Sequence, residues 1–175
     1  SDEWPVHGTT GYEFLSAVNA LLVDPRGLAQ LEQAHKTVCG RTQKRSTITL
    51  RSKLFVLSHL FRADVRRLAR RIAALPGDTL HADSDTSQFE RAIRDITARL
   101  PVYRTYIRRS APVREGDFSL VRASASRARG STRVRADMHA LEQLERMLCL
   151  EVPDILRGPV TDIVLTWQQL TGAAM

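Results

Sequence analysis

The sequence predicts a mainly α-helical chain with one short strand. Apolar residues recur every three or four positions along most of it, and strings rich in Pro and Gly separate these helical patterns. A single stretch, residues 102–107, is β-branched and aromatic without a helical period. With 175 residues, of which 43% are hydrophobic, the chain is long and apolar enough to form a real core.

The first elements are a loop and two helices. Residues 1–11 contain Pro5 and Gly8 and are predicted to be a loop. A helix is expected from Tyr12, and its apolar face ends at the turn string 24–27. A second, weaker helix is expected over residues 28–38, with Gly40 ending it.

The clearest pattern predicts one long helix over residues 48–75, closed by Pro76 and Gly77. Its apolar stripe is expected to be core and comprises Leu50, Leu54, Leu57, Phe61, Val65, Leu68, Ile72 and Leu75. After a polar loop, residues 79–86, Ser87 is expected to cap another helix. That helix has predicted core positions Phe89, Ile93, Ile96 and Leu100.

The strand is predicted directly after Pro101, from Val102 to Ile107. Alternation would place Val102, Arg104 and Tyr106 on one face and Tyr103 and Thr105 on the other. A lone strand lacks partners for its backbone groups. Either a weak second strand is present in the chain, or the partner strands belong to a larger β/α protein of which this chain is a piece.

Three further helices are predicted. One is expected to run from Asp117 to Arg129; a second would be capped by Asp137, and a last one would follow Pro159. Their expected core residues are Met138, Leu141, Leu144, Leu148, Val160, Ile163, Val164, Trp167 and Leu170. The prediction for 1–175 is thus a single mostly helical fragment, with a loop at 1–11, helices over 12–100, a strand at 101–107 and helices over 113–172.

The net charge of +7 is concentrated in one segment. Residues 104–135 hold nine Arg and two acids, which gives +7, and the other 17 basic and 17 acidic residues cancel. One interpretation is a non-enzymatic basic helical module that binds nucleic acid or another anionic partner through this segment. Against it, the chain has 23 Arg and only three Lys, so its arginines reflect general composition, and we do not expect nucleic acid to be the partner.

Cysteine and histidine give no metal or redox motif. Cys39 and Cys149 are predicted to be buried free thiols of a cytoplasmic protein, and no histidine pair has metal-ligand spacing. No metal or organic cofactor is expected. No apolar run approaches the roughly 18 residues of a membrane span, and no membrane partner is expected.

Three strings resemble signatures of the maltooligosyltrehalose synthases, a family of α-amylase-type enzymes. They are Trp4–Leu15, which contains Gly8-Thr9-Thr10-Gly11-Tyr12, then Pro101–Tyr106, and Gln168–Gly172 followed by Met175. They occur in the family's order. In the third string, Ala173 and Ala174 stand where the family usually has Pro and Val.

The resemblance implies a helical subdomain of a (β/α)8 barrel enzyme, of which this chain is an excised internal piece. These enzymes convert the α-1,4 linkage at the reducing end of a maltooligosaccharide into an α,α-1,1 trehalose linkage. A carboxylate nucleophile and a second carboxyl acting as acid and base carry the reaction. The family's carboxylates have no matching positions in residues 1–175, so no catalytic residue is assigned and the chain alone is expected to be inactive.

The resemblance also implies the substrate-binding residues. Thr9, Thr10 and Tyr12 would belong to a loop beyond one barrel strand, and Tyr103, Arg104 and Tyr106 would lie on another strand near the sugar. Read without the resemblance, the first group is an ordinary helix-entry turn and the second is a half-buried strand. The expected partners are a maltooligosaccharide and the rest of the barrel.

Overall fold

The chain is mainly α-helical, as the sequence predicts. The computed structural model describes residues 11–40, 44–76, 85–132 and 135–174, and within these ranges it has eight helices and no strand. It divides into two compact units, residues 1–44 and 45–175. No helix in the described ranges is both long and apolar enough to cross a membrane.

The smaller unit contributes helices α1 (Tyr12–Leu22) and α2 (Pro25–Cys39). Helix α2 begins three residues before the predicted start, because the Asp24 carboxylate accepts the Arg26 and Gly27 N–H groups and Pro25 suits the first turn. Gly40 ends α2 with a positive φ of 69°, as expected. Helix α2 has no buried residue.

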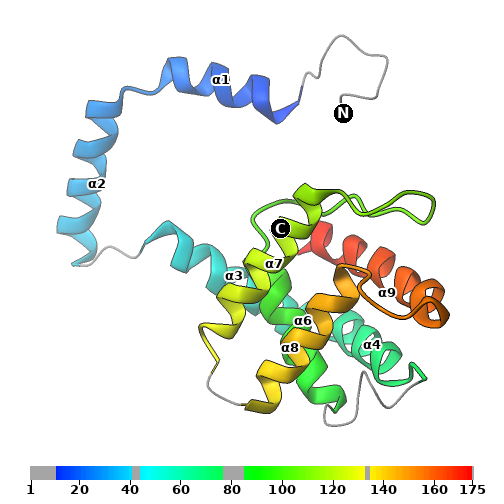
Figure 1. The fold of residues 1–175 in the computed structure, drawn as a ribbon. Coiled ribbons are helices and arrows are strands. Elements are labelled where there is room, and N and C mark those ends of the chain that lie inside the picture. Colours follow the sequence, from blue (N-terminus) through cyan, green and yellow to red (C-terminus); the bar gives the residue numbers. More distant parts are fainter. Residues whose placement is uncertain (1–10, 41–43, 77–84, 133–134, 175) are drawn as a thin grey trace. The chain divides into compact units, whose positions relative to one another are not determined.

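The larger unit is built around one central helix, α6, to which α3, α4, α7 and α8 all pack (Figure 1). Helix α9 packs against α4 and α8. The bounds are α3 Arg45–His59, α4 Arg62–Ala73, α6 Thr86–Arg99, α7 Glu115–Arg129, α8 Arg135–Leu148 and α9 Asp154–Ala173.

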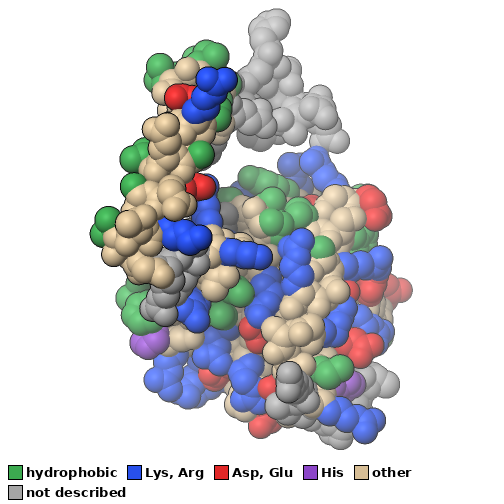
Figure 2. Space-filling model, turned by 90° about the vertical axis from the view of Figure 1, so that its left-hand side faces the viewer, with side chains coloured by type: hydrophobic (Ala, Val, Ile, Leu, Met, Phe, Trp, Pro, Cys, Tyr) green, Lys and Arg blue, Asp and Glu red, His purple; other side chains and the backbone are tan. Residues whose placement is uncertain are grey.

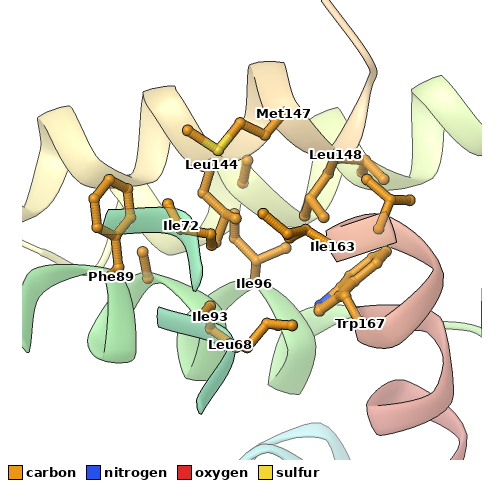
Figure 3. Packing of buried hydrophobic residues seen from close by; sticks show 14 of the residues in the cluster. Leu68, Ile72, Phe89, Ile93, Ile96, Leu144, Met147, Leu148, Ile163 and Trp167 are labelled. Atoms are coloured by element: carbon orange, nitrogen blue, oxygen red, sulfur yellow. The ribbon is translucent and has the colours of Figure 1, made fainter. Parts of the chain in front are cut away.

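The core forms where the apolar stripes of α4, α6, α8 and α9 converge (Figure 3). All four core positions predicted on α6, from Phe89 to Leu100, are at most 1% exposed. Trp167 of α9 is fully buried, and its indole N–H donates to Thr97 Oγ1 of α6 over 2.9 Å. This hydrogen bond satisfies the one polar atom that the indole carries into the core.

The predicted long helix is wrong in one respect: it is two helices, α3 and α4. The Leu60 and Phe61 N–H groups both donate to Val56 O, so the last turn of α3 widens and α4 starts again at Arg62. The stripe nonetheless faces the core, because its eight residues are either buried or packed against the buried cluster. No Pro or Gly marks the break, and the apolar period continues through it.

The predicted starts of α6, α7 and α9 are also wrong. The cap of α6 is Asp85 and not Ser87, because the Asp85 carboxylate accepts the Gln88 N–H and the Gln88 side chain accepts the Asp85 N–H. Asp117 lies inside the first turn of α7. Helix α9 begins at Asp154, so Pro159 lies within it; its missing N–H falls near the exposed start of the helix, where water can bond the unpaired carbonyl.

Two residues expected to be buried are exposed. Met138 of α8 is 42% exposed, whereas Leu141, Leu144 and Leu148 are buried as predicted. Cys39 is an exposed free thiol, whereas Cys149 is buried.

The predicted cap of α8 is also wrong. Asp137 lies in the first turn of α8, where its carboxylate accepts from the Arg91 guanidinium of α6 over 2.7 Å.

Candidate functional site

The candidate site is built on residues 102–107, between α6 and α7. These residues were predicted to form a strand, and the structure corrects this, because no strand occurs in the described ranges. Thr105 and Ile107 are nonetheless buried, while Tyr103 and Tyr106 are 57% and 54% exposed. The segment thus has an inner face and an outer face without a partner strand.

A side chain of α9 takes the place of that partner strand. Gln168 Oε1 accepts the Ile107 N–H over 2.8 Å, and Gln168 Nε2 donates to Ile107 O over 3.1 Å. The same Oε1 accepts the Thr105 hydroxyl over 2.9 Å. Because the amide has both a donor and an acceptor, it satisfies the two backbone groups of Ile107 as a neighbouring strand would.

Helix α7 contributes a second hydrogen bond to this segment. Asp117 Oδ1 accepts the Tyr106 N–H over 3.3 Å, and Asp117 is only 8% exposed. The backbone on either side of Tyr106 is therefore fixed by Asp117 and by Gln168, from two different helices. The Tyr106 side chain projects outward from this fixed stretch.

Tyr103 lies directly against Gly172 of α9. A Cβ placed on Gly172 would lie 2.9 Å from both Cζ and Oη of Tyr103. Real Cβ contacts are essentially never that short, so any other residue at position 172 would displace the ring. The phenol end of Tyr103 therefore occupies the space that the missing side chain leaves.

Arg104 lies beside Tyr106, as alternation predicted. Alternation was wrong for Tyr103, which was expected on the face of Thr105: Thr105 is buried, whereas Tyr103 is exposed. The Arg104 guanidinium carbon is 4.9 Å from the centre of the Tyr106 ring, which is cation–π range. Tyr103, Arg104 and Tyr106, called the tyrosine surface below, thus combine two exposed rings with a cationic hydrogen-bond donor. Such groups suit a polyhydroxylated ligand, since phenol rings stack on apolar sugar faces and guanidinium groups donate to hydroxyls.

The structure therefore brings together three of the six expected binding residues. Thr9 and Thr10 lie outside the described residues. Tyr12 is the first residue of α1, in the other unit, and its side chain is not among those described.

Sequence reasoning missed Gln168, Gly172 and Asp117 as parts of the site. Gln168 left a signal, because it follows Val164 by four positions and so continues the buried stripe of α9 as a polar residue. A buried amide needs hydrogen-bond partners, which marks such a position as a contact to another segment. Asp117 left no such signal.

The basic segment 104–135 is partly neutralised by acids from outside it. Arg109, Arg122 and Arg129 form ion pairs with Asp162, Glu151 and Glu145, respectively. Figure 2 shows one face of the molecule, where Lys and Arg side chains lie among Asp and Glu side chains on the larger unit. Net charge in the sequence therefore overstates how basic this segment is in the fold.

A second basic surface lies on α4. Its exposed arginines line a hollow of about 860 Å³ that also reaches His59 at the end of α3. The five are Arg62, Arg66, Arg67, Arg70 and Arg71. Two of them are ion-paired, Arg66 with Glu90 and Arg67 with Asp64. The described residues contain no group of three side chains suited to hold a metal ion.

No protein-family model, curated protein or solved structure matches this chain.

Proposed function

We propose that this chain is a helical subdomain of a maltooligosyltrehalose synthase, a barrel enzyme that isomerises the reducing-end α-1,4 linkage of maltooligosaccharides to an α,α-1,1 linkage. In that enzyme the tyrosine surface would contact the oligosaccharide. The catalytic carboxylates and the barrel strands would come from other parts of the enzyme. The enzyme would act in the cytoplasm, without a metal or organic cofactor.

One observation carries the proposal: two of the three strings that resemble the family meet in the fold. Residues 101–106 and 168–172 are more than 60 positions apart, yet Gln168 bonds Thr105 and Ile107, and Gly172 lies against Tyr103. Strings that together build a site are expected to lie close in space. Unrelated chance matches have no reason to do so.

The exposed apolar side chains of the smaller unit are consistent with a larger enzyme. Leu21 and Leu22 of α1 are 87% and 80% exposed, and Leu31 and Val38 of α2 are 68% and 84% exposed. Helices that expose this much apolar surface usually cover another element. In the proposed enzyme, another part of the same protein would provide that element.

Binding of maltopentaose to the 175-residue chain tests the proposal. We expect weak binding, with a dissociation constant on the order of millimolar, seen as shifts of the Tyr103 and Tyr106 NMR signals. Cellopentaose, which has the same sugar units in β-1,4 linkage, is the matched control and should shift them less. Equal responses to both sugars, or none to either, would count against the proposal.

A second candidate function is binding of a nucleic acid by a non-enzymatic basic module. The observation that favours it is the hollow of five arginines on α4, which replaces segment 104–135 as the place where such binding would occur. Phosphate contacts make affinity fall steeply with salt. A salt titration with a single-stranded oligonucleotide, comparing the chain with Arg62→Gln/Arg70→Gln, separates this candidate from the first.

A further inference from the structure

We propose that Gly172 and Gln168 of α9 are positioning residues for the tyrosine surface, and that affinity for a maltooligosaccharide depends on both. The sugar part of this inference rests on the function proposed above. The positioning itself does not, and it can be measured without sugar.

The two residues act from one face of one helix. They are four positions apart in α9, so they lie on the same side, separated by about 6 Å along the helix axis. Gln168 bonds Thr105 and Ile107, and the phenol end of Tyr103 lies in the space beside Gly172. Both ends of segment 103–107 therefore lie against the same helix.

Gly172 has a specific reason to be glycine. Glycine inside a helix is about 1 kcal/mol less favourable than alanine, and α9 continues past it to Ala173. The backbone there does not require glycine, since the positive-φ glycine in the described residues is Gly40. What position 172 does require is the absence of a side chain, because a Cβ there would lie only 2.9 Å from the ring of Tyr103.

Gln168 fixes the segment's register. Its amide bonds both backbone groups of Ile107, and a slip of the segment by one residue against this amide would turn Tyr106 away from solvent. Asp117 adds only one bond, of 3.3 Å, to the Tyr106 N–H. Without the amide, the backbone beside Tyr106 loses its main restraint.

The key variant is Gly172→Ala, and Gly158→Ala is its matched control. Both changes are Gly to Ala within α9, and both should favour the helix. A Cβ on Gly158 meets no atom within 4 Å, whereas one on Gly172 meets Tyr103. Because Tyr103 is more than half exposed, its ring can swing outward, and we expect Gly172→Ala to fold.

The measurement is fluorine NMR of the chain labelled with 3-fluorotyrosine, whose three tyrosine signals are assigned by Tyr→Phe changes. Gly172→Ala should shift the Tyr103 signal and raise the maltopentaose dissociation constant about tenfold. Gly158→Ala should do neither. Gln168→Met, which keeps the volume but removes the amide, should instead shift and broaden the Tyr106 signal, also with weaker sugar binding.

The results separate the two proposals. An unmoved Tyr103 signal in Gly172→Ala and an unmoved Tyr106 signal in Gln168→Met would overturn the positioning roles. Shifted signals with unchanged maltopentaose affinity would overturn the dependence of sugar binding on them. If the unaltered chain binds no maltopentaose, the proposed function fails, while the fluorine signals still decide whether Gly172 and Gln168 position the rings.

Discussion

The side-chain amide of Gln168 bonds both the N–H and the C=O of Ile107, so one residue of α9 makes the two hydrogen bonds that a neighbouring strand would make. Gln168 is 5% exposed and Ile107 is 3% exposed, so these bonds are shielded from water. The segment that carries Ile107 is thereby held against α9 without a second strand. The bonds also connect the last helix of the larger unit to the segment that carries the tyrosine surface.

This relationship predicts a large stability cost for Gln168→Met. The substitution leaves the buried N–H and C=O of Ile107 without partners, and each such group costs about 1–3 kcal/mol. We expect the free energy of unfolding to fall by about 2–4 kcal/mol, measured by urea denaturation of the isolated chain. Gln169→Met, at the exposed neighbouring position, is the control and should change it by less than about 0.5 kcal/mol.

The apolar stripe of α3 and α4 predicts a second stability difference. Leu57 is fully buried and Leu68 is 2% exposed, so Leu57→Ala or Leu68→Ala should each lower the free energy of unfolding by about 2–5 kcal/mol. Leu60, between the two helices, is 72% exposed, and Leu60→Ala should have little effect. If all three variants unfold at the same urea concentration, the stripe does not face the core described here.

The two cysteines should differ in reactivity. Burial raises the pKa of the Cys149 thiol to about 12, so almost none is thiolate at pH 8, whereas Cys39 is exposed. We expect an aromatic disulfide reagent to modify one thiol in the folded chain and two in urea. Cys39→Ser should abolish the reaction of the folded chain, and rapid modification that remains would mean that Cys149 is accessible.

The apolar pattern of the sequence predicted most helices and most of the core, because a helix that packs on a core needs apolar residues along its buried face. It did not predict helix ends that depend on individual hydrogen bonds. The break between α3 and α4 arises where two N–H groups share Val56 O, and no residue type marks it. The start of α6 depends on whether Asp85 or Ser87 accepts an N–H of the first helical turn, and both residue types are common caps.

The sequence pointed to the three residues of the tyrosine surface, but not to the side chains of other helices that contact their segment. The change of pattern at 102–107 correctly indicated a break between helices, and alternation placed Arg104 beside Tyr106 but put Tyr103 on the wrong face. The partner of that segment is a glutamine more than 60 positions away. The sequence pattern of a strand indicates that its backbone needs hydrogen-bond partners. It does not indicate that a side-chain amide, and not a second strand, supplies them. The predicted strand was wrong for that reason.

The central claim is that the tyrosine surface belongs to a trehalose-forming glucosylmutase. Its most direct test is the activity of the enzyme to which we propose this chain belongs, with maltopentaose as substrate and non-reducing, trehalose-ended product as the readout. We expect turnover by that intact protein and none by the 175-residue chain, because the reaction needs two carboxyl groups about 5 Å apart, which in our proposal lie outside residues 1–175. Tyr103→Ala or Tyr106→Ala in the intact protein should lower the rate at least about tenfold. No trehalose-ended product from the intact protein, or turnover by the 175-residue chain alone, would contradict the account.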